Sequence, residues 1–157
     1  MLLPLVEYLT VDRVSIEADL KSRDDVLQRL ARLLCQSKDA EPALRNNQEG
    51  VLSEIKKREV LGSTGIGGGI ALPHIYLDVE KLYVAMVRTE KGVDFNALDE
   101  QPCRVFLLII ASKDHRQQYI QLLSQISRLM KVPSTREAIL KAKSEPEIIR
   151  IIRDACS

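Results

Sequence analysis

A glycine-rich stretch, residues 62–74 (GSTGIGGGIALPH), constrains the fold of this chain more than any other segment. It holds five of the seven glycines and ends on His74, one of the two histidines. Glycine at this density disfavours helix and strand, because each glycine costs conformational entropy. Such a run suits positions that need positive φ angles or a close approach to the backbone. We expect its N–H groups to line a concave pocket that favours anions, with His74 at the rim and Pro73 fixing the chain before it.

Residues that can bind a phosphate lie just before this stretch and within it. The planar fork of Arg58 can hold two phosphate oxygens, and a neutral imidazole, with an ordinary pKa of about 6.5, offers one nitrogen lone pair if its other nitrogen donates a hydrogen bond. His74 is therefore a candidate for phosphoryl transfer, a reaction that depends mainly on alignment and charge neutralisation. The residues expected to support the phosphate are Arg58, Ser63, Thr64, Gly65 and Gly67.

Several other kinds of site are disfavoured. The dinucleotide fingerprint fails because Ile70 stands where its third glycine would be, and no Gly-Lys-Ser/Thr ends a phosphate loop. Histidines and cysteines lack the spacing of a metal site, so no metal and no cofactor is expected. A hydrolase built on Ser63, His74 and Asp78 lacks the G-x-S-x-G turn that presents a serine. The remaining alternative is a structural histidine at a strand end.

The length, composition and net charge indicate one ordinary globular domain. The 157 residues are 45% hydrophobic and 29% charged, and the net charge of +1 gives no electrostatic footprint for nucleic acid or an anionic membrane. The apolar start lacks a basic region and is too short to span a bilayer. Three widely spaced cysteines, Cys35, Cys103 and Cys156, are expected to be reduced thiols of a cytoplasmic protein.

Hydrophobic spacing predicts strands alternating with helices, and therefore an α/β domain with helices on both faces of a sheet. Strands are expected at 14–16, 69–72, 82–87 and 105–111, with a turn at Lys91 and Gly92 and a loop or short helix at 93–102. Helices are expected at about 22–34, from 43 or 46 to 58, 112–131, 133–140 and 144–152, and a helical turn at 5–9. The buried stripe of the helix at 112–131 is expected to comprise Ile120, Leu122, Leu123, Ile126, Leu129 and Met130.

Residues 63–74 (STGIGGGIALPH) resemble the signature of the fructose/mannitol-type IIA domains of the bacterial phosphoenolpyruvate-dependent phosphotransferase system, in particular the stand-alone nitrogen-regulatory branch. The likeness extends over the whole chain, 1–157, as a single such domain, and includes the pair Arg58 and Glu59. It implies a three-layer α/β/α sandwich with a mixed central sheet. It also implies that His74 accepts a phosphoryl group from a small histidine phosphocarrier protein.

One position departs from the family. Many members carry a second histidine at the start of the long helix, against the phosphorylated ring; here that place falls on Tyr119, or on Gln118 with a slip of one residue. His115 lies one helical turn earlier and is the other candidate, or a solvated helix-start residue. A tyrosine can donate a hydrogen bond to the phosphate but cannot relay positive charge.

Three functions remain open on this basis. The first is a cytoplasmic phosphocarrier whose phosphorylation state is read by a regulatory target, favoured by the absence of IIB, IIC or membrane sequence. The second is a IIA component that passes phosphate to the cysteine of a separate IIB partner for sugar uptake. The third is a binding module on the same fold that is not phosphorylated, motivated by the missing histidine.

Overall fold

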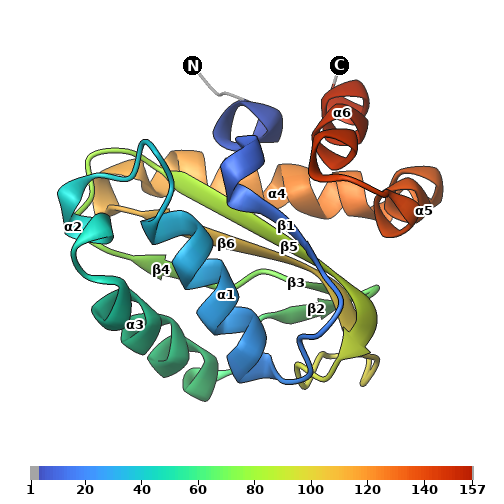
Figure 1. Ribbon diagram of the computed structural model, residues 1–157, viewed down its shortest axis with the longest axis horizontal. Helices are drawn as coiled ribbons and strands as arrows, with labels where there is room; N and C mark the ends of the chain where they lie inside the picture. Colours follow the sequence, from blue (N-terminus) through green and yellow to red (C-terminus); the bar gives the residue numbers. More distant parts are fainter. Residues whose placement is uncertain (1–3, 157) are drawn as a thin grey trace.

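A single sheet runs through the middle of the protein, with helices on both of its faces (Figure 1). The computed structural model describes residues 4–156. Helices α1 (Arg23–Cys35) and α3 (Gln48–Leu61) cover one face, and α4 (Arg116–Lys131) crosses the other, beside α5 (Pro133–Lys141) and α6 (Glu145–Cys156) (Figure 1). The short α2 (Pro42–Arg45) joins α1 to α3. This arrangement is the α/β/α sandwich that the sequence predicts.

Six strands of the described residues make up the sheet, in the order β1-β5-β6-β3-β2, with β4 also paired to β6. The pairs β1–β5, β3–β6 and β4–β6 are parallel, whereas β5–β6 and β2–β3 are antiparallel, so the sheet is mixed as expected. The strands are β1 (Val14–Glu17), β2 (Gly65–Gly67), β3 (Ile70–Ala71), β4 (His74–Tyr76), β5 (Tyr83–Val93) and β6 (Cys103–Ala111).

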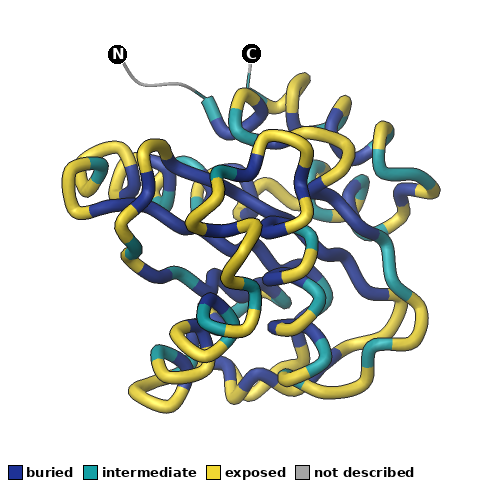
Figure 2. The backbone as a smooth tube through the Cα atoms, turned by 60° about the vertical axis from the view of Figure 1, so that its left-hand side comes forward, coloured by how far each residue is buried: buried dark blue, intermediate teal, exposed yellow. Residues whose placement is uncertain are grey.

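Both faces of the long central strands are buried, which explains their nearly continuous apolar sequence. Alternate residues of β5 point to opposite faces: Val84 and Met86 pack with α4 and α6, whereas Ala85 and Val87 pack with α1 and α3. Figure 2 shows the resulting distribution, with buried segments through the centre and exposed segments in the outer loops and helix faces. The sheet, which is packed on both faces, therefore holds the backbone of residues at its edge in a fixed position.

The predicted helix start at Ser22 is confirmed as a capping box: Ser22 Oγ accepts from Asp25 N at 3.1 Å, and Asp25 Oδ2 accepts from Ser22 N at 3.2 Å. The predicted helical turn at 5–9 is a 3₁₀ turn, Leu5–Tyr8. The second predicted helix is divided into α2 and α3. The third, expected at 112–131, begins at Arg116 as α4, after a 3₁₀ turn at Lys113–His115.

The turn predicted at Lys91 and Gly92 is wrong, because β5 continues to Val93, which pairs with Cys103 of β6. Gly92 is needed there for close approach rather than for a turn: a Cβ on it would lie 2.6 Å from Pro102 Cβ. The chain reverses within 94–102 instead, which the structure shows as a loop. The expected burial of Ile120 is also wrong, since 52% of its surface is exposed.

Candidate functional site

His74 is the first residue of β4 and lies half-buried at the edge of the sheet. Sequence reasoning placed it at the end of the strand 69–72, but Pro73 separates the two short strands β3 and β4. The register pairs His74 with Ile109, two residues before the end of β6, and Ile109 N donates to Pro73 O at 3.0 Å. Its backbone is therefore held by the most deeply buried strand of the sheet.

One ring nitrogen of His74 is committed to the backbone. Nδ1 lies 2.8 Å from Leu72 O, and because a carbonyl oxygen only accepts, Nδ1 must carry the proton. Burial lowers the pKa of the imidazole below its ordinary value and the charge of Arg58 lowers it further, while the Leu72 hydrogen bond and the charge of Glu59 oppose these effects. The ring is consequently neutral near pH 7, with its lone pair on Nε2.

Arg58, in the last turn of α3, is close enough to His74 for its charge to affect the imidazole. Its Nη1 donates to Gly62 O at 2.8 Å, across the end of the helix. A guanidinium has five N–H donors, so this bond leaves others for an anion. The predicted contact of Arg58 with a phosphate stays a prediction.

The glycine-rich stretch forms a tight hairpin between β2 and β3. Gly67, Gly68 and Gly69 turn the chain with φ angles of 92°, 67° and 81°, which residues with a side chain rarely adopt. Gly65 meets a second requirement, because a Cβ there would lie 2.8 Å from Ala97 Cβ. The glycines thus serve both purposes that their density suggests, positive φ and close approach.

Polar groups of this stretch form internal hydrogen bonds. Ser63 Oγ donates to Phe95 O and accepts from Gly65 N at 3.0 Å, and the Thr64 hydroxyl donates to Glu59. Gly68 N donates to Asp99 Oδ2 at 3.0 Å. Ser63, Thr64 and Gly65 therefore hold the stretch in place; their predicted contacts with a phosphate, and that of Gly67, remain predictions.

Of the three residues considered for the place beside His74, the structure brings Tyr119 to it. The two ring centroids are 5.4 Å apart, and the ring of Tyr76 also lies 5.4 Å from that of Tyr119, edge-on to it. His115 Nδ1 lies 2.8 Å from Ser112 Oγ. His115 and Gln118 line a cavity of about 340 Å³ together with Arg13 and Lys81, and His74 is not among the residues that line it. Burial raises the pKa of Tyr119, so its hydroxyl keeps its proton.

Exposed apolar side chains lie near these residues in the sequence or on segments paired with them. Leu61 ends α3 three residues after Arg58, Ile66 lies within β2, and Ile120 follows Tyr119. Leu98 is 85% exposed, and its N–H donates to Gly65 O at 3.4 Å. We call these four residues the apolar rim. Sequence reasoning missed it, because the pattern of α4 predicted a buried Ile120 and Leu98 stood in a segment without periodicity.

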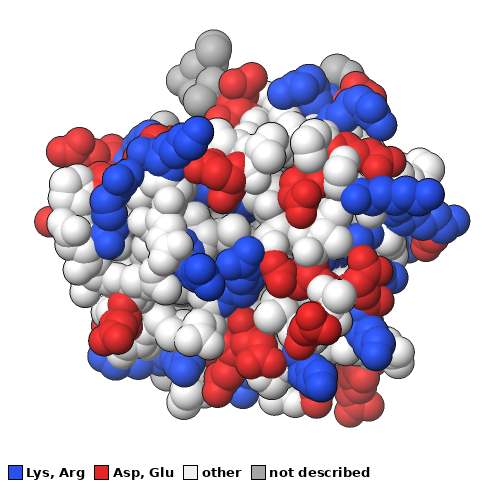
Figure 3. Space-filling view, viewed as in Figure 1, with Lys and Arg blue, Asp and Glu red and all other residues white. Residues whose placement is uncertain are grey.

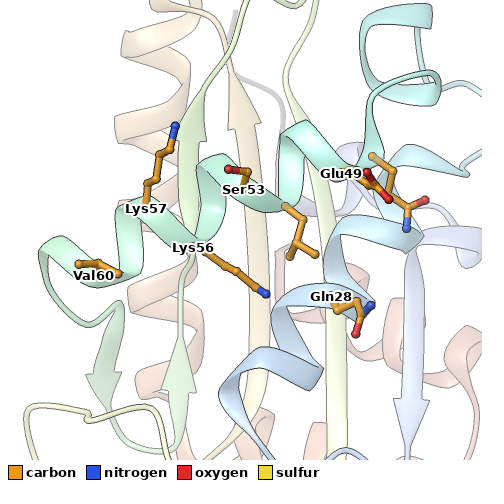
Figure 4. Close-up of a pocket in the computed structure, with 8 residues that line it drawn as sticks. Gln28, Glu49, Ser53, Lys56, Lys57 and Val60 are labelled. Atoms are coloured by element: carbon orange, nitrogen blue, oxygen red, sulfur yellow. The ribbon is translucent and has the colours of Figure 1, made fainter.

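The basic residues before the glycines, Lys56, Lys57 and Arg58, point in different directions. A groove of about 590 Å³ lies between α1 and α3 and is lined by Gln28, Lys56 and Lys57 among others. Figure 4 shows Lys56 extending from α3 toward α1, while Lys57 points away. Lys57 Nζ pairs with Glu54 at 3.3 Å. None of the predicted site residues lines this groove.

The surface carries no broad area of one charge on the face shown in Figure 3, where acidic and basic side chains are interspersed. This agrees with the net charge of +1. Within residues 4–156, no three His, Cys, Asp or Glu side chains are arranged to hold a metal ion. No helix in that range combines the length and the apolar character required to cross a bilayer.

Comparison with known protein families confirms the resemblance seen in the sequence. The family model described as "Phosphoenolpyruvate-dependent sugar phosphotransferase system, EIIA 2" matches residues 7–155. The chain therefore belongs to the EIIA 2 family.

Relatives of two kinds match the chain. The nitrogen regulatory protein of Pseudomonas aeruginosa is 26% identical over 151 residues, covering 96% of this chain and 95% of that protein. The fructose-specific EIIABC component of Bacillus subtilis is 30% identical over 149 residues, or 94% of this chain, which spans only 23% of that protein.

Solved structures show the same fold. Nitrogen regulatory protein IIA-Ntr from Neisseria meningitidis superposes with a TM-score of 0.83 at 23% identity, covering 94% of this chain and 98% of that one. IIA mannitol from Escherichia coli superposes with a TM-score of 0.74 at 19% identity, covering 92% and 98%. At these identities the likeness establishes the architecture alone.

Proposed function

We propose that this chain is a cytoplasmic phosphoryl carrier of the phosphotransferase system, phosphorylated on Nε2 of His74 by a histidine phosphocarrier protein. The observation that carries the proposal is the 2.8 Å contact between His74 Nδ1 and Leu72 O. It places the proton on Nδ1 and leaves the Nε2 lone pair as the nucleophile. Half-burial supports the same function, because it keeps the ring neutral near pH 7.

The transfer needs no proton to move. The Nε2 lone pair of His74 forms a bond to phosphorus while the N–P bond of the donor's phosphohistidine breaks, and that electron pair returns to the donor's ring. Arg58 neutralises charge on the phosphoryl oxygens through donors that its bond to Gly62 leaves unused. The Tyr119 hydroxyl, which keeps its proton, donates a hydrogen bond to a phosphoryl oxygen in place of the family's second histidine. These groups align and stabilise the phosphoryl group, which is the main requirement of such reactions.

The apolar rim is the proposed contact surface for the phosphocarrier donor. Large apolar side chains exposed around a reacting group are typical of a surface that another protein covers. The rim carries Leu61, Ile66 and Leu98 on the side of the glycine hairpin and Ile120 on the side of α4.

The proposed output is regulatory: the phosphorylation state of His74 is read by a target protein. The similarity to the nitrogen regulatory protein of Pseudomonas aeruginosa along nearly the whole of both chains supports this reading. The second candidate is transfer to a IIB cysteine for sugar uptake. It is supported by the similarity to the fructose-specific EIIABC component and by the likeness to the IIA of a solved IIA–IIB mannitol complex, with a TM-score of 0.72.

Intact-mass measurement tests phosphorylation. The protein is incubated with phosphoenolpyruvate, enzyme I and a histidine phosphocarrier, as wild type, His74→Ala and His115→Ala. Because the chain has only two histidines, His115→Ala is a matched control. One acid-labile phosphate is expected on wild type and His115→Ala and none on His74→Ala. Phosphate on His74→Ala would overturn the assignment.

A measurement of onward phosphoryl transfer distinguishes the regulatory function from the sugar-uptake function. The phosphorylated protein is mixed with IIB domains of the fructose and mannitol types, and the phosphate on each IIB cysteine is measured. A regulatory protein is expected to keep its phosphate, whereas rapid loss to a IIB cysteine would favour the sugar-uptake reading.

A further inference from the structure

Glu59, in the last turn of α3, is a buried carboxylate, with 4% of its surface exposed. A carboxylate is seldom buried unless it is paired, because leaving water penalises its charge. Its oxygens accept from Thr64 N at 3.4 Å and from the Thr64 hydroxyl. Arg23 Nη1 is 4.0 Å from Glu59 Oε2, and the Arg23 side chain is 34% exposed. The hydrogen bonds of Glu59 therefore hold the start of the glycine-rich stretch.

These hydrogen bonds continue from Thr64 to the ring of His74. Thr64 O accepts from Leu72 N at 2.9 Å, and Leu72 O accepts from His74 Nδ1 at 2.8 Å. The antiparallel pairing of Gly65 with Ala71 ties the two segments together between these points. The carbonyl that fixes the proton of His74 is thus positioned through Thr64 by a buried charge on another element.

The location of that proton decides the charge of the phosphorylated ring. When Nε2 of the neutral imidazole bonds to phosphorus and Nδ1 keeps its proton, the product is a cationic phosphoimidazolium. Breaking its N–P bond later returns the electron pair to Nε2 and releases a neutral imidazole, a good leaving group. Loss of the Nδ1 proton would instead require an imidazolate to leave, which is unfavourable.

The charge of Glu59 acts in the same direction as its hydrogen bonds. Burial is the largest influence on the pKa of His74 and lowers it, as Arg58 does, while the Leu72 hydrogen bond and the Glu59 charge raise it. The two neighbours Arg58 and Glu59 therefore act oppositely on the ring. If the carboxylate were removed, only the Leu72 hydrogen bond would oppose the lowering of the His74 pKa by burial and by Arg58.

We propose that Glu59 is a positioning residue: through Thr64 and Leu72 it keeps the proton of His74 on Nδ1, so that the phosphorylated ring stays cationic and passes its phosphate on. The proposal rests on the phosphoryl-carrier function above. It assigns Glu59 no contact with the phosphate.

The test compares wild type with Glu59→Gln and Thr64→Val, and with Glu54→Gln as the matched control. Glu54 lies on the same helix, where its side chain is 48% exposed and pairs with Lys57. Circular dichroism checks the fold of each protein. Nitrogen-15 NMR reports the tautomer of His74 and the pH at which the phosphorylated ring loses its proton, and the rate of phosphoryl exchange with the donor is followed from pH 6 to 9.

Wild type and Glu54→Gln are expected to hold the proton on Nδ1 and to share one pH profile. Glu59→Gln and Thr64→Val are expected to show mixed tautomers, and the phosphorylated ring to lose its proton at lower pH. Each unit of this shift lowers the fraction of cationic ring about tenfold at high pH, and the exchange rate falls with it. At low pH, where every phosphorylated ring is protonated, the rates converge.

A wild-type tautomer and pH profile in both Glu59→Gln and Thr64→Val would overturn the positioning role while leaving the carrier function intact. If one variant does not fold, the other decides. Failure of wild type itself to take up phosphate would overturn the carrier function instead. The tautomer of the unphosphorylated ring, measured on the same samples, would still decide whether Glu59 orients His74.

Discussion

Burial keeps the imidazole of His74 neutral in the folded protein, and this couples folding stability to pH. The folded pKa lies below the ordinary value of about 6.5, to which the ring returns on unfolding. As the pH falls below about 6.5, the unfolded chain binds more protons than the folded one, so the free energy of unfolding decreases until the folded pKa is passed. In His74→Gln this decrease should be smaller.

Urea unfolding at pH 7.5, 6.5 and 5.5 measures the effect in wild type and His74→Gln. Carboxylates titrate in a separate window: backbone hydrogen bonds from Gln101 and Gly68 lower the pKa of Asp99 below 3.8, so the stability that Asp99 contributes is lost only at lower pH. An equal loss of stability in wild type and His74→Gln between pH 7.5 and 5.5 would refute a buried neutral His74.

The sequence predicted individual side chains of the site better than it predicted the hydrogen bonds that position them. The glycines and Pro73 pointed to His74, and alignment on the long helix pointed to Tyr119, which lies against the His74 ring. The Leu72 carbonyl gave no signal, because a backbone acceptor is the same at every residue. The function of Glu59 was also hidden: its partner Thr64 becomes a neighbour only after the chain turns at the end of α3.

At the element scale, the glycine hairpin is held by close backbone packing, and Gly65→Ala tests this. The new methyl group would lie 2.8 Å from Ala97 Cβ and 2.9 Å from Ala97 Cα, so the backbone itself would have to shift. We expect a loss of about 1–3 kcal/mol in the free energy of unfolding, the usual cost of overpacking. Guanidinium unfolding curves give this difference.

Gly62→Ala is the control for that substitution. An added Cβ at Gly62 meets no atom within 4 Å, and its φ of 165° is extended backbone open to any residue. Its stability should stay within about 0.5 kcal/mol of wild type or increase slightly, because alanine restricts the unfolded chain. Equal losses in the two variants would show that glycine is not needed at 65 for close packing.

The same kind of contact explains why element boundaries were harder to predict than element types. Gly92 suggested a turn, yet β5 passes through it because Pro102 approaches too closely for a side chain. β2 consists of Gly65–Gly67 and has no apolar pattern, so its pairing with β3 could not be read from hydrophobic spacing. Long apolar segments such as 105–111 were predictable, because burial on both faces determines their composition.

At the scale of the whole molecule, the layered architecture follows from the sequence, whereas the proposed contact surface does not. Alternation of strands and helices determines which faces become buried. An exposed apolar residue looks the same in sequence as a buried one, and Ile120 shows the consequence. The apolar rim is therefore a property of the folded chain as a whole.

The last prediction concerns that surface. Leu98→Asp places a charge in the apolar rim, and we expect it to lower kcat/KM for phosphorylation of His74 about tenfold or more, the effect of removing an interface anchor worth ~1.4 kcal/mol. Val132→Asp is the control: Val132 is also exposed (45%) but lies past the far end of α4 from Tyr119, about 20 Å along the helix axis. Both variants should unfold at the wild-type urea concentration. Stopped-flow phosphorylation at rising donor concentration should slow for Leu98→Asp alone. Equal rates in the two variants would place the donor's contacts away from Leu98.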